Sequence, residues 1–426
     1  MADIFPFRAT IYNQKKIKDL SKTVAPPYDI ISKKEQKQLY RAHPNNIVRL
    51  ILEKDKNYKK ASGDFKKWLK ERILVEDEKP SIYVYLQEFT AGSKKLKRLG
   101  FLALMKIDEA KKKKILPHEN VLLKPLEDRL RLLKSVKANL SPIFSVFGDE
   151  NKEVTNILGS FTRKKKPFIN IHFGGVKHLV WKLDDEKLQK KILKSMSRKK
   201  VFIADGHHRY QAATLYRDHM RKKLGKATGK ERFDYLISYF VSAEDKGLIT
   251  FPTHRAIVRI PDFNKDKVLS ILSAHFRISL LDSKKALLEN MRRLAKESGV
   301  FGLYMGDKRY YLLRIKDIKI LAKQMPGESK ERRALDVVIL HSFILKKLLK
   351  MEQGFENKEN FIFSHKDDYI LRLVDGKKAQ AAFLLNPTKI EDVKKVAFSN
   401  QKMPQKSTYF YPKVLSGVVI NNHHTG

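Results

Sequence analysis

The chain has 426 residues, no cysteine, and 89 lysines and arginines against 47 aspartates and glutamates, which gives a net charge of +42. The lack of thiols excludes disulfides, zinc–thiolate sites, iron–sulfur clusters and cysteine nucleophiles, and the apolar runs fall well short of the ~18 residues that cross a membrane. The N-terminus has no basic segment followed by an apolar one, so we expect no secretory signal, no membrane partner and a cytoplasmic protein.

The positive charge has two interpretations. It can attract a polyanion such as nucleic acid through counterion release, or it can be the lysine-rich surface of an enzyme. The lysines lie in short clusters along the whole chain, for example at 111–114 and 164–166. Nucleic-acid binders more often concentrate charge on one face or tail, so the distribution favours the enzyme and leaves nucleic acid as a less favoured partner.

Residues 1–150 are predicted to form an N-terminal subdomain. Periodicity predicts helices at 33–42, 57–71 and 126–138 and strands at 81–89 and 99–107.

Three polar motifs lie among these predicted elements. TVAPPYDIIS at 23–32 holds Asp29 in a proline-fixed turn, and HPNNIVRL at 43–50 places Arg49 in an otherwise apolar strand, where it binds an anion or only pairs with an acid. PHENVLLKPLEDR at 117–129 offers His118, Glu119 and Arg129. A carboxylate beside such cations is a candidate general base, although Glu119 can equally cap the following turn.

Residues 151–426 are predicted to form a second subdomain. Strands are expected at 169–173, 201–204, 235–243, 251–259, 369–374 and 381–385, with a turn at 375–376 between the last two. Helices are expected at 185–196, 209–223, 265–275, 284–297 and 333–349. Because strands and helices do not alternate regularly, we predict an α+β fold of mixed sheets with flanking helices and at least two subdomains.

The stretch VFIADGHHRYQAATLY at 201–216 carries the strongest chemical signal. Apolar VFIA predicts a strand and QAATLY a helix, so the turn between them holds Asp205, Gly206, His207, His208 and Arg209. The first turn of a helix presents unpaired N–H groups and the positive end of the dipole, which together bind phosphate. Arginine adds bidentate contacts, histidine donates or moves protons, and aspartate can hold Mg²⁺ against phosphates. The alternatives are solvated turn histidines and, less favoured, a zinc site.

Two later motifs add cations and hydroxyls. FPTHR at 251–255 contains His254 and Arg255, and MPQKSTYFYPKVLSG at 403–417 contains Lys406 and Ser407, a candidate anion site. The chain has neither the GxxxxGK[ST] phosphate loop nor the GxGxxG dinucleotide fingerprint.

These motifs, in this order, resemble the DUF1015 family over nearly the whole chain. The resemblance rests on TVAPPYDIIS, HPNNIVRLIL, PHENVLLKPLEDRLRLLKSVKANLSPIF, IADGHHRYQAA, FPTHR and MPQKSTYFYPKVLSGVV. It implies a ParB/sulfiredoxin-like phosphate-binding core, in which a G-x-[HR]-R turn before a helix holds phosphate. It also implies a kinase that converts free L-serine to O-phospho-L-serine, with Mg²⁺ and with pyrophosphate, ATP or ADP as the donor.

The resemblance gives the motif residues expected roles. Asp205 is a metal ligand or base, Glu119 the alternative base, and His207 a further catalytic group. The expected phosphate-binding residues are Gly206, His208, Arg209, Arg49, Lys406 and Ser407. The expected substrate-binding residues are Asp29, His118, Arg129, His254 and Arg255. A ParB-like DNA-binding or nuclease-type protein, and a sensor that binds a phosphorylated ligand without turnover, remain the alternatives.

Overall fold

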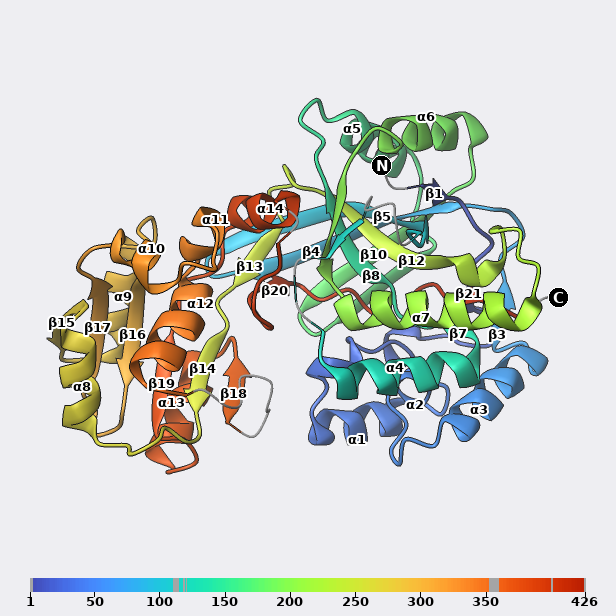
Figure 1. Ribbon diagram of the computed structural model, residues 1–426. Helices are drawn as coiled ribbons and strands as arrows, with labels where there is room; N and C mark the ends of the chain where they lie inside the picture. Colours follow the sequence, from blue (N-terminus) through green and yellow to red (C-terminus); the bar gives the residue numbers. More distant parts are fainter. Residues whose placement is uncertain are drawn as a thin grey trace. The chain divides into compact units, whose positions relative to one another are not determined.

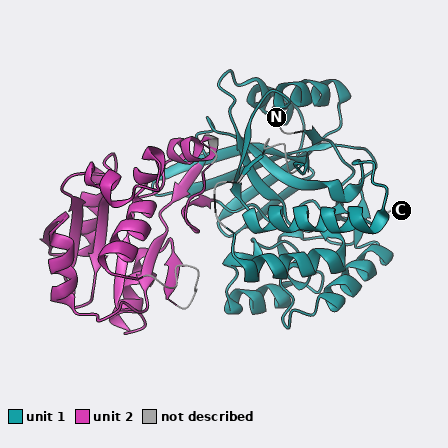
Figure 2. Cartoon of the chain, in the orientation of Figure 1, with its two compact units in different colours: residues 1–117, 121–248, 412–426 teal, residues 118–120, 249–411 magenta. Residues whose placement is uncertain are grey.

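The hairpin of β4 (Ile82–Ala91) and β5 (Lys94–Lys106) organises the central sheet of the protein. This computed structural model describes residues 3–109, 115–117, 119, 121–351, 360–399 and 401–424. The chain divides into two compact units, and Figure 2 colours them separately. The first unit comprises residues 1–117, 121–248 and 412–426, and the second comprises residues 118–120 and 249–411.

The first unit is built on a nine-stranded mixed sheet. Its strands run in the order β6-β11-β8-β12-β5-β4-β10-β9, with β1 also paired to β5. The pairs β6–β11 and β8–β12 are parallel and the other pairs are antiparallel. The other strands of this unit are β1 (Ile4–Phe5), β2 (Thr10–Tyr12), β3 (Leu74–Glu76), β6 (Ile115–Pro117), β7 (Ala138–Asn139), β8 (Ile143–Phe147), β9 (Ile169–Phe173), β10 (Val176–Leu183), β11 (Val201–Asp205), β12 (Tyr235–Ser242) and β21 (Asn421–Asn422).

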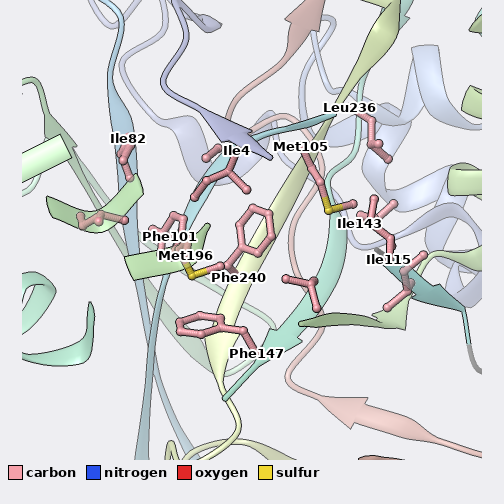
Figure 3. Close-up of a cluster of buried hydrophobic side chains, with 14 of the residues drawn as sticks. Ile4, Ile82, Phe101, Met105, Ile115, Ile143, Phe147, Met196, Leu236 and Phe240 are labelled. Atoms are coloured by element: carbon pink, nitrogen blue, oxygen red, sulfur yellow. The ribbon is translucent and has the colours of Figure 1, made fainter. Parts of the chain in front are cut away.

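Helices cover both faces of this sheet, with α5 and α6 on one side and α4 and α7 on the other (Figure 1). The α-helices of the first unit are α1 (Lys33–Ala42), α2 (Val48–Ile51), α3 (Tyr58–Lys70), α4 (Leu123–Val136), α5 (Glu153–Lys164), α6 (Glu186–Met196) and α7 (His207–Leu224). Short 3-10 turns are η1 (Leu20–Lys22), η2 (Tyr28–Ile30) and η3 (Arg232–Asp234). Apolar side chains of strands and helices meet in one buried cluster, part of which Figure 3 shows around Phe101 and Phe240. This burial provides the main driving force for the fold of the unit.

The second unit has its own six-stranded antiparallel sheet, in the order β15-β17-β16-β19-β14-β18. Its strands are β13 (Ile249–Phe251), β14 (His254–Ile257), β15 (Phe276–Leu281), β16 (Val300–Tyr304), β17 (Tyr310–Ile315), β18 (Phe361–Ser364), β19 (Ala381–Leu384) and β20 (Tyr409–Tyr411). Its helices are α8 (Lys265–Ser273), α9 (Lys284–Arg293), α10 (Ile320–Gln324), α11 (Lys330–Arg333), α12 (Asp336–Val338), the π-helix η4 (Ile339–Leu348), α13 (Asp367–Asp375) and α14 (Ile390–Phe398).

The α+β class with mixed sheets and flanking helices is confirmed, but three local predictions are wrong. The predicted strand at 369–374 is helix α13, and the predicted turn at 375–376 is the end of that helix, where Gly376 is the C-cap. The apolar segment around Arg49 is helix α2 and not a strand. The predicted boundary near residue 150 falls inside the first unit, whose chain continues to Leu248 and returns at Pro412. Among the described residues, no helix is long and apolar enough to cross a membrane.

The buried histidine of β10 makes the stability of the first unit depend on pH. Burial lowers the pKa of His178 to about 3, and its Nδ1 lies 2.6 Å from the Tyr85 hydroxyl oxygen. In the unfolded chain this pKa is about 6.5, so the unfolded state binds more protons below that pH. We therefore expect the free energy of unfolding to decrease as the pH is lowered below about 6.5. His178 should contribute a decrease of up to about 1.4 kcal/mol for each pH unit.

Urea unfolding between pH 7.5 and pH 5 measures this dependence in a range above the titration of most carboxylates. His178→Gln should reduce the slope with pH, because glutamine does not titrate. An unchanged slope in that variant would mean that His178 is not held neutral.

Candidate active site

The turn after β11 is shaped by a bulge and by one glycine. The pairing of β11 with β8 shifts register between Ile203 and Asp205, which is a bulge of the kind that re-aims a side chain at the end of a strand. Gly206 then has φ 98°, and a Cβ at this position would lie 2.9 Å from both Arg209 Nη2 and Ile143 Cγ2. The position therefore requires glycine for its backbone angle and for space.

Helix α7 begins directly after Gly206, at His207, and its N-cap residue is this glycine, which provides no side-chain cap. Its first N–H groups thus have no side-chain acceptor from the capping position, in the place where the sequence predicted a phosphate site. His207 is buried, whereas His208 is partly exposed and its Nε2 accepts a hydrogen bond from the Leu122 N–H at 3.1 Å. His208 therefore joins the start of α7 to the start of α4 and is the acceptor in that contact.

Asp205 lies between two cations. One carboxylate oxygen is 3.4 Å from Arg209 Nη2, and the other is 3.4 Å from Lys413 Nζ. All three side chains are largely buried, with exposed fractions of 25% for Asp205, 13% for Arg209 and 11% for Lys413. Charges at this depth interact more strongly than they would in water, because the surroundings are less polarisable.

Arg129 of α4 forms a second buried cationic group in the first unit. Its Nε donates to Asp128 at 2.9 Å, its Nη1 donates to the Ile51 carbonyl at 2.7 Å, and its guanidinium lies 3.9 Å from the centre of the Tyr28 ring. The Tyr58 hydroxyl donates to Asp128 at 2.6 Å. Burial raises the pKa of Asp128, but Arg129 and Tyr58 outweigh it and hold that pKa below its usual value.

A cavity of about 60 Å³ connects these two groups of side chains within the first unit. Arg129 and Arg209 both line it, together with Tyr28 and with residues of α4, α7, β8 and β12. Three separated sequence motifs, TVAPPYDIIS, PHENVLLKPLEDR and DGHHR, thus meet at one place in the fold.

The candidate residues of the second unit form their own cluster, in which Arg255 and Ser407 are buried and Lys406 is exposed. Glu119 Oε1 accepts from the Ser407 N–H at 3.2 Å and from the Thr408 hydroxyl at 3.4 Å, both far along the chain from the turn that it was expected to cap. Arg255 donates to the Lys406 carbonyl at 3.0 Å and to His341 Nε2 at 3.3 Å. Burial lowers the pKa of Arg255 to about 9, while the charge of Glu119 acts in the opposite direction.

The remaining candidates have separate locations. His254 Nδ1 accepts from the Leu385 N–H at 3.1 Å, and burial lowers its pKa to about 4. Arg49 lies over the Tyr40 ring and donates to the Tyr40 carbonyl at 2.9 Å. Asp29 is exposed in η2, and His118 lies outside the described residues.

Comparison with known families shows the family to which the chain belongs. The sequence model described as "Protein of unknown function (DUF1015)" matches residues 4–338. The protein belongs to the DUF1015 family. No curated protein sequence matches the chain.

Solved structures with weak similarity to this DUF1015 protein include a conserved hypothetical protein from Pyrococcus furiosus, with 14% identity, 74% of this chain and 92% of that chain covered, and a TM-score of 0.35. A free serine kinase in complex with AMP has 14% identity, 72% and 86% coverage, and a TM-score of 0.34. SbnI with a C-terminal truncation, from Staphylococcus aureus, has 14% identity, 75% and 86% coverage, and a TM-score of 0.36. At this level of similarity, the site must be argued from the residues of this chain.

Lys413 is a residue of the candidate site that the sequence did not predict. It lies in the motif MPQKSTYFYPKVLSG, in which Lys406 was the predicted cation. Buried Arg98 donates to the carbonyl of Pro412 and to the Gln87 side chain, and Gln87 donates to the Lys413 carbonyl at 3.0 Å. Burial lowers the pKa of the Arg98 guanidinium. A buried arginine and a buried glutamine in the middle of two strands are the signal that could have pointed to this segment.

The described residues of this DUF1015 protein include no group of three or more histidine or acidic side chains that could hold a metal. A single carboxylate such as that of Asp205 is sufficient for Mg²⁺, because this ion is often bound through one or two carboxylates with substrate phosphates supplying further oxygens. The donor set therefore suits a metal that arrives with a phosphorylated substrate.

Proposed function

We propose that this protein transfers a phosphoryl group to the hydroxyl of free L-serine and so forms O-phospho-L-serine. The observation that carries the proposal is the turn at 205–209, where Asp205, Arg209 and Lys413 meet at the uncapped start of α7. The choice of serine comes from the ordered motifs that resemble serine kinases of this family. The donor is pyrophosphate or a nucleotide such as ATP or ADP.

Phosphoryl transfer needs positioning and charge stabilisation more than covalent chemistry from the protein. The N–H groups at the start of α7 bind the phosphate oxygens of the donor, and the positive end of the helix dipole favours their charge. Arg209 contributes a planar pair of donors, and Lys413 contributes a second cation 3.4 Å from Asp205. These groups stabilise the negative charge that is spread over the phosphoryl oxygens during transfer.

Asp205 is either a metal ligand or the base, and Glu119 is the alternative base. If Asp205 is the base, its carboxylate accepts the proton of the serine hydroxyl as that oxygen attacks phosphorus, and the bridging P–O bond of the donor breaks to release phosphate from pyrophosphate, ADP from ATP or AMP from ADP. If Asp205 holds Mg²⁺, which would neutralise charge on the donor phosphates, Glu119 is the base. His207 and His208 lie at the start of the same helix, and a histidine there can donate hydrogen bonds or move protons.

A donor panel tests the proposed function. The purified protein is incubated with L-serine, Mg²⁺ and pyrophosphate, ATP or ADP, and O-phospho-L-serine is measured by mass spectrometry. We expect product with at least one donor and none when serine is replaced by L-alanine, which lacks the hydroxyl. Absence of product with every donor would refute the serine kinase.

The net charge of +42 favours one alternative, a protein that binds nucleic acid. The same panel separates the alternatives, because a sensor or a nucleic-acid-binding protein gives no phosphoserine. Tight binding of the donor without product would indicate a sensor of a phosphorylated ligand.

A further inference from the structure

The cavity between α4 and α7 is lined by both cationic and apolar side chains. Arg129 and Arg209 supply guanidinium groups to its lining, and Leu132, Ile143 and Leu236 supply hydrocarbon. Its volume of about 60 Å³ accommodates roughly four to six water-sized groups, at about 10–15 Å³ for each. A carboxylate group with its attached carbon has four non-hydrogen atoms and matches that size.

Both arginines have donors left for a ligand. A guanidinium carries five N–H bonds. In the described part of the chain, Arg129 directs its N–H groups to Asp128 and to the Ile51 carbonyl, and Arg209 directs its own to Asp205 and the Pro142 carbonyl. These contacts use three of the five N–H bonds of Arg129 and two of the five of Arg209. The remaining N–H bonds are enough for a planar acceptor with two oxygens.

The charge around the cavity favours an anion. Asp128 balances one arginine and Asp205 balances the other, while Lys56 lies 3.7 Å from Asp128 and Lys413 lies 3.4 Å from Asp205. The charged groups in these contacts therefore leave an excess of positive charge. A pyrophosphate end would bring more charge against the apolar walls, where its desolvation is unfavourable. A carboxylate brings a single charge and two in-plane acceptors.

We propose that this cavity binds the α-carboxylate of the amino-acid acceptor. The inference rests on the proposed function and deepens it, because it assigns the acceptor its own subsite beside the phosphate turn. Arg209 belongs to both places, since it lines the cavity and also contacts Asp205. An amino acid held by its carboxylate between Arg129 and Arg209 directs its short side chain toward the turn, which selects an α-amino acid over a simple alcohol.

Binding of unreactive ligands tests the subsite without turnover. L-Alanine keeps the carboxylate and lacks the hydroxyl, whereas ethanolamine keeps the hydroxyl and lacks the carboxylate. Calorimetric titration of the full chain should detect L-alanine and L-serine with similar affinity, and ethanolamine should bind at least about tenfold more weakly.

Arg129→Lys and a matched control locate that binding. Lysine keeps the charge but loses the planar pair of donors, so affinity for L-alanine should fall about tenfold or more. Arg217→Lys is the control, because Arg217 is also buried, also pairs with the adjacent aspartate, and also donates to backbone carbonyls, at 2.7 and 3.1 Å, but does not line the cavity. Its affinity for L-alanine should stay within about twofold of wild type.

A second pair of variants covers the case in which Arg129→Lys does not fold. Ala212→Val adds methyl groups to a residue that lines the cavity, and Ala213→Val adds them to the neighbouring buried residue, which does not. L-Alanine binding should be lost in the first and kept in the second. Unchanged affinity in Arg129→Lys or Ala212→Val, or a loss of pyrophosphate binding greater than the loss of alanine binding, would overturn the proposal.

The two proposals fail in different ways. The wild type could form O-phospho-L-serine while its affinity for L-alanine does not depend on Arg129. This result would support the kinase and refute the carboxylate subsite. The opposite result is alanine binding that depends on Arg129 with no product from any donor. It would support the carboxylate subsite and refute the proposed kinase activity.

Discussion

Asp205→Asn is expected to lower kcat for phosphorylation of L-serine by about 100- to 1,000-fold, with little loss of folded protein. Asparagine has the shape of aspartate, and its single amide oxygen can still accept a hydrogen bond from either Arg209 or Lys413, so the turn should keep its structure. It has no negative charge, so it neither takes the proton of the serine hydroxyl nor holds Mg²⁺ effectively. Either role of Asp205 therefore predicts a loss that appears mainly in kcat.

Steady-state kinetics and thermal unfolding of the same preparations check this result. Asp218→Asn is the matched control, because Asp218 lies on α7, is half exposed and pairs with an arginine at 2.8 Å. Wild-type kcat in Asp205→Asn would remove Asp205 from the mechanism. Comparison of Asp205→Asn with Glu119→Gln then identifies the base. The variant that has lost the base should lose the acidic limb of the pH profile of kcat/KM. A variant that has lost a metal ligand should instead be rescued by a higher Mg²⁺ concentration.

The sequence predicted the site best where its residues are adjacent. Asp205 to Arg209 occupy consecutive positions, so a strand pattern, a glycine and a helix pattern were enough to indicate the turn. Lys413 approaches Asp205 only because its segment returns to the first unit, where Arg98 and Gln87 hold its backbone. Local periodicity contains no information about such a contact, and Lys406 of the same motif looked equally suitable.

The wrong local predictions have identifiable physical causes. In the segment 369–374, Ile370, Leu371, Leu373 and Val374 are buried, which is the spacing of one helix face and not the alternation of a strand. The aspartate–glycine pair that followed is typical both of a hairpin turn and of a helix end, and here it ends α13.

In two further segments, hydrogen bonds between side chains and nearby residues determine the local structure. Around Arg49, the buried Asn46 side chain accepts from the Val48 N–H at 2.9 Å, and this contact starts helix α2 in a run that looked like a strand. The predicted boundary between the subdomains falls at residue 150, directly after Asp149. Asp149 accepts from the N–H and hydroxyl of Thr155 at 2.9 and 2.8 Å, so this segment is instead the ordered entry to α5.

Lys413→Met is expected to raise the KM for the phosphate donor about 10- to 100-fold, which corresponds to one charge-assisted contact of about 1.5–3 kcal/mol. The lysine side chain is 11% exposed and its Nζ lies 3.4 Å from Asp205, so its loss leaves that carboxylate with Arg209 as its remaining cation among these three groups. Methionine keeps most of the volume of the lysine stem, so packing should change little. The KM for L-serine should rise less, because Lys413 does not line the cavity beside Arg129.

Lys199→Met is the matched control for this variant. Lys199 lies in the first unit, is 16% exposed and pairs with Asp149 at 3.3 Å, so its replacement also breaks a partly buried ion pair. It should lower stability without changing the donor KM. Lys413→Met could change only the thermal midpoint, as Lys199→Met should. In that case Lys413 would be a structural partner of Asp205, and the donor phosphate would be bound by Arg209 and the N-terminus of α7 alone. A selective rise in the donor KM would instead mean that the contacts of Arg98 and Gln87 with the backbone at 412–413 serve to place a phosphate-binding cation beside the turn.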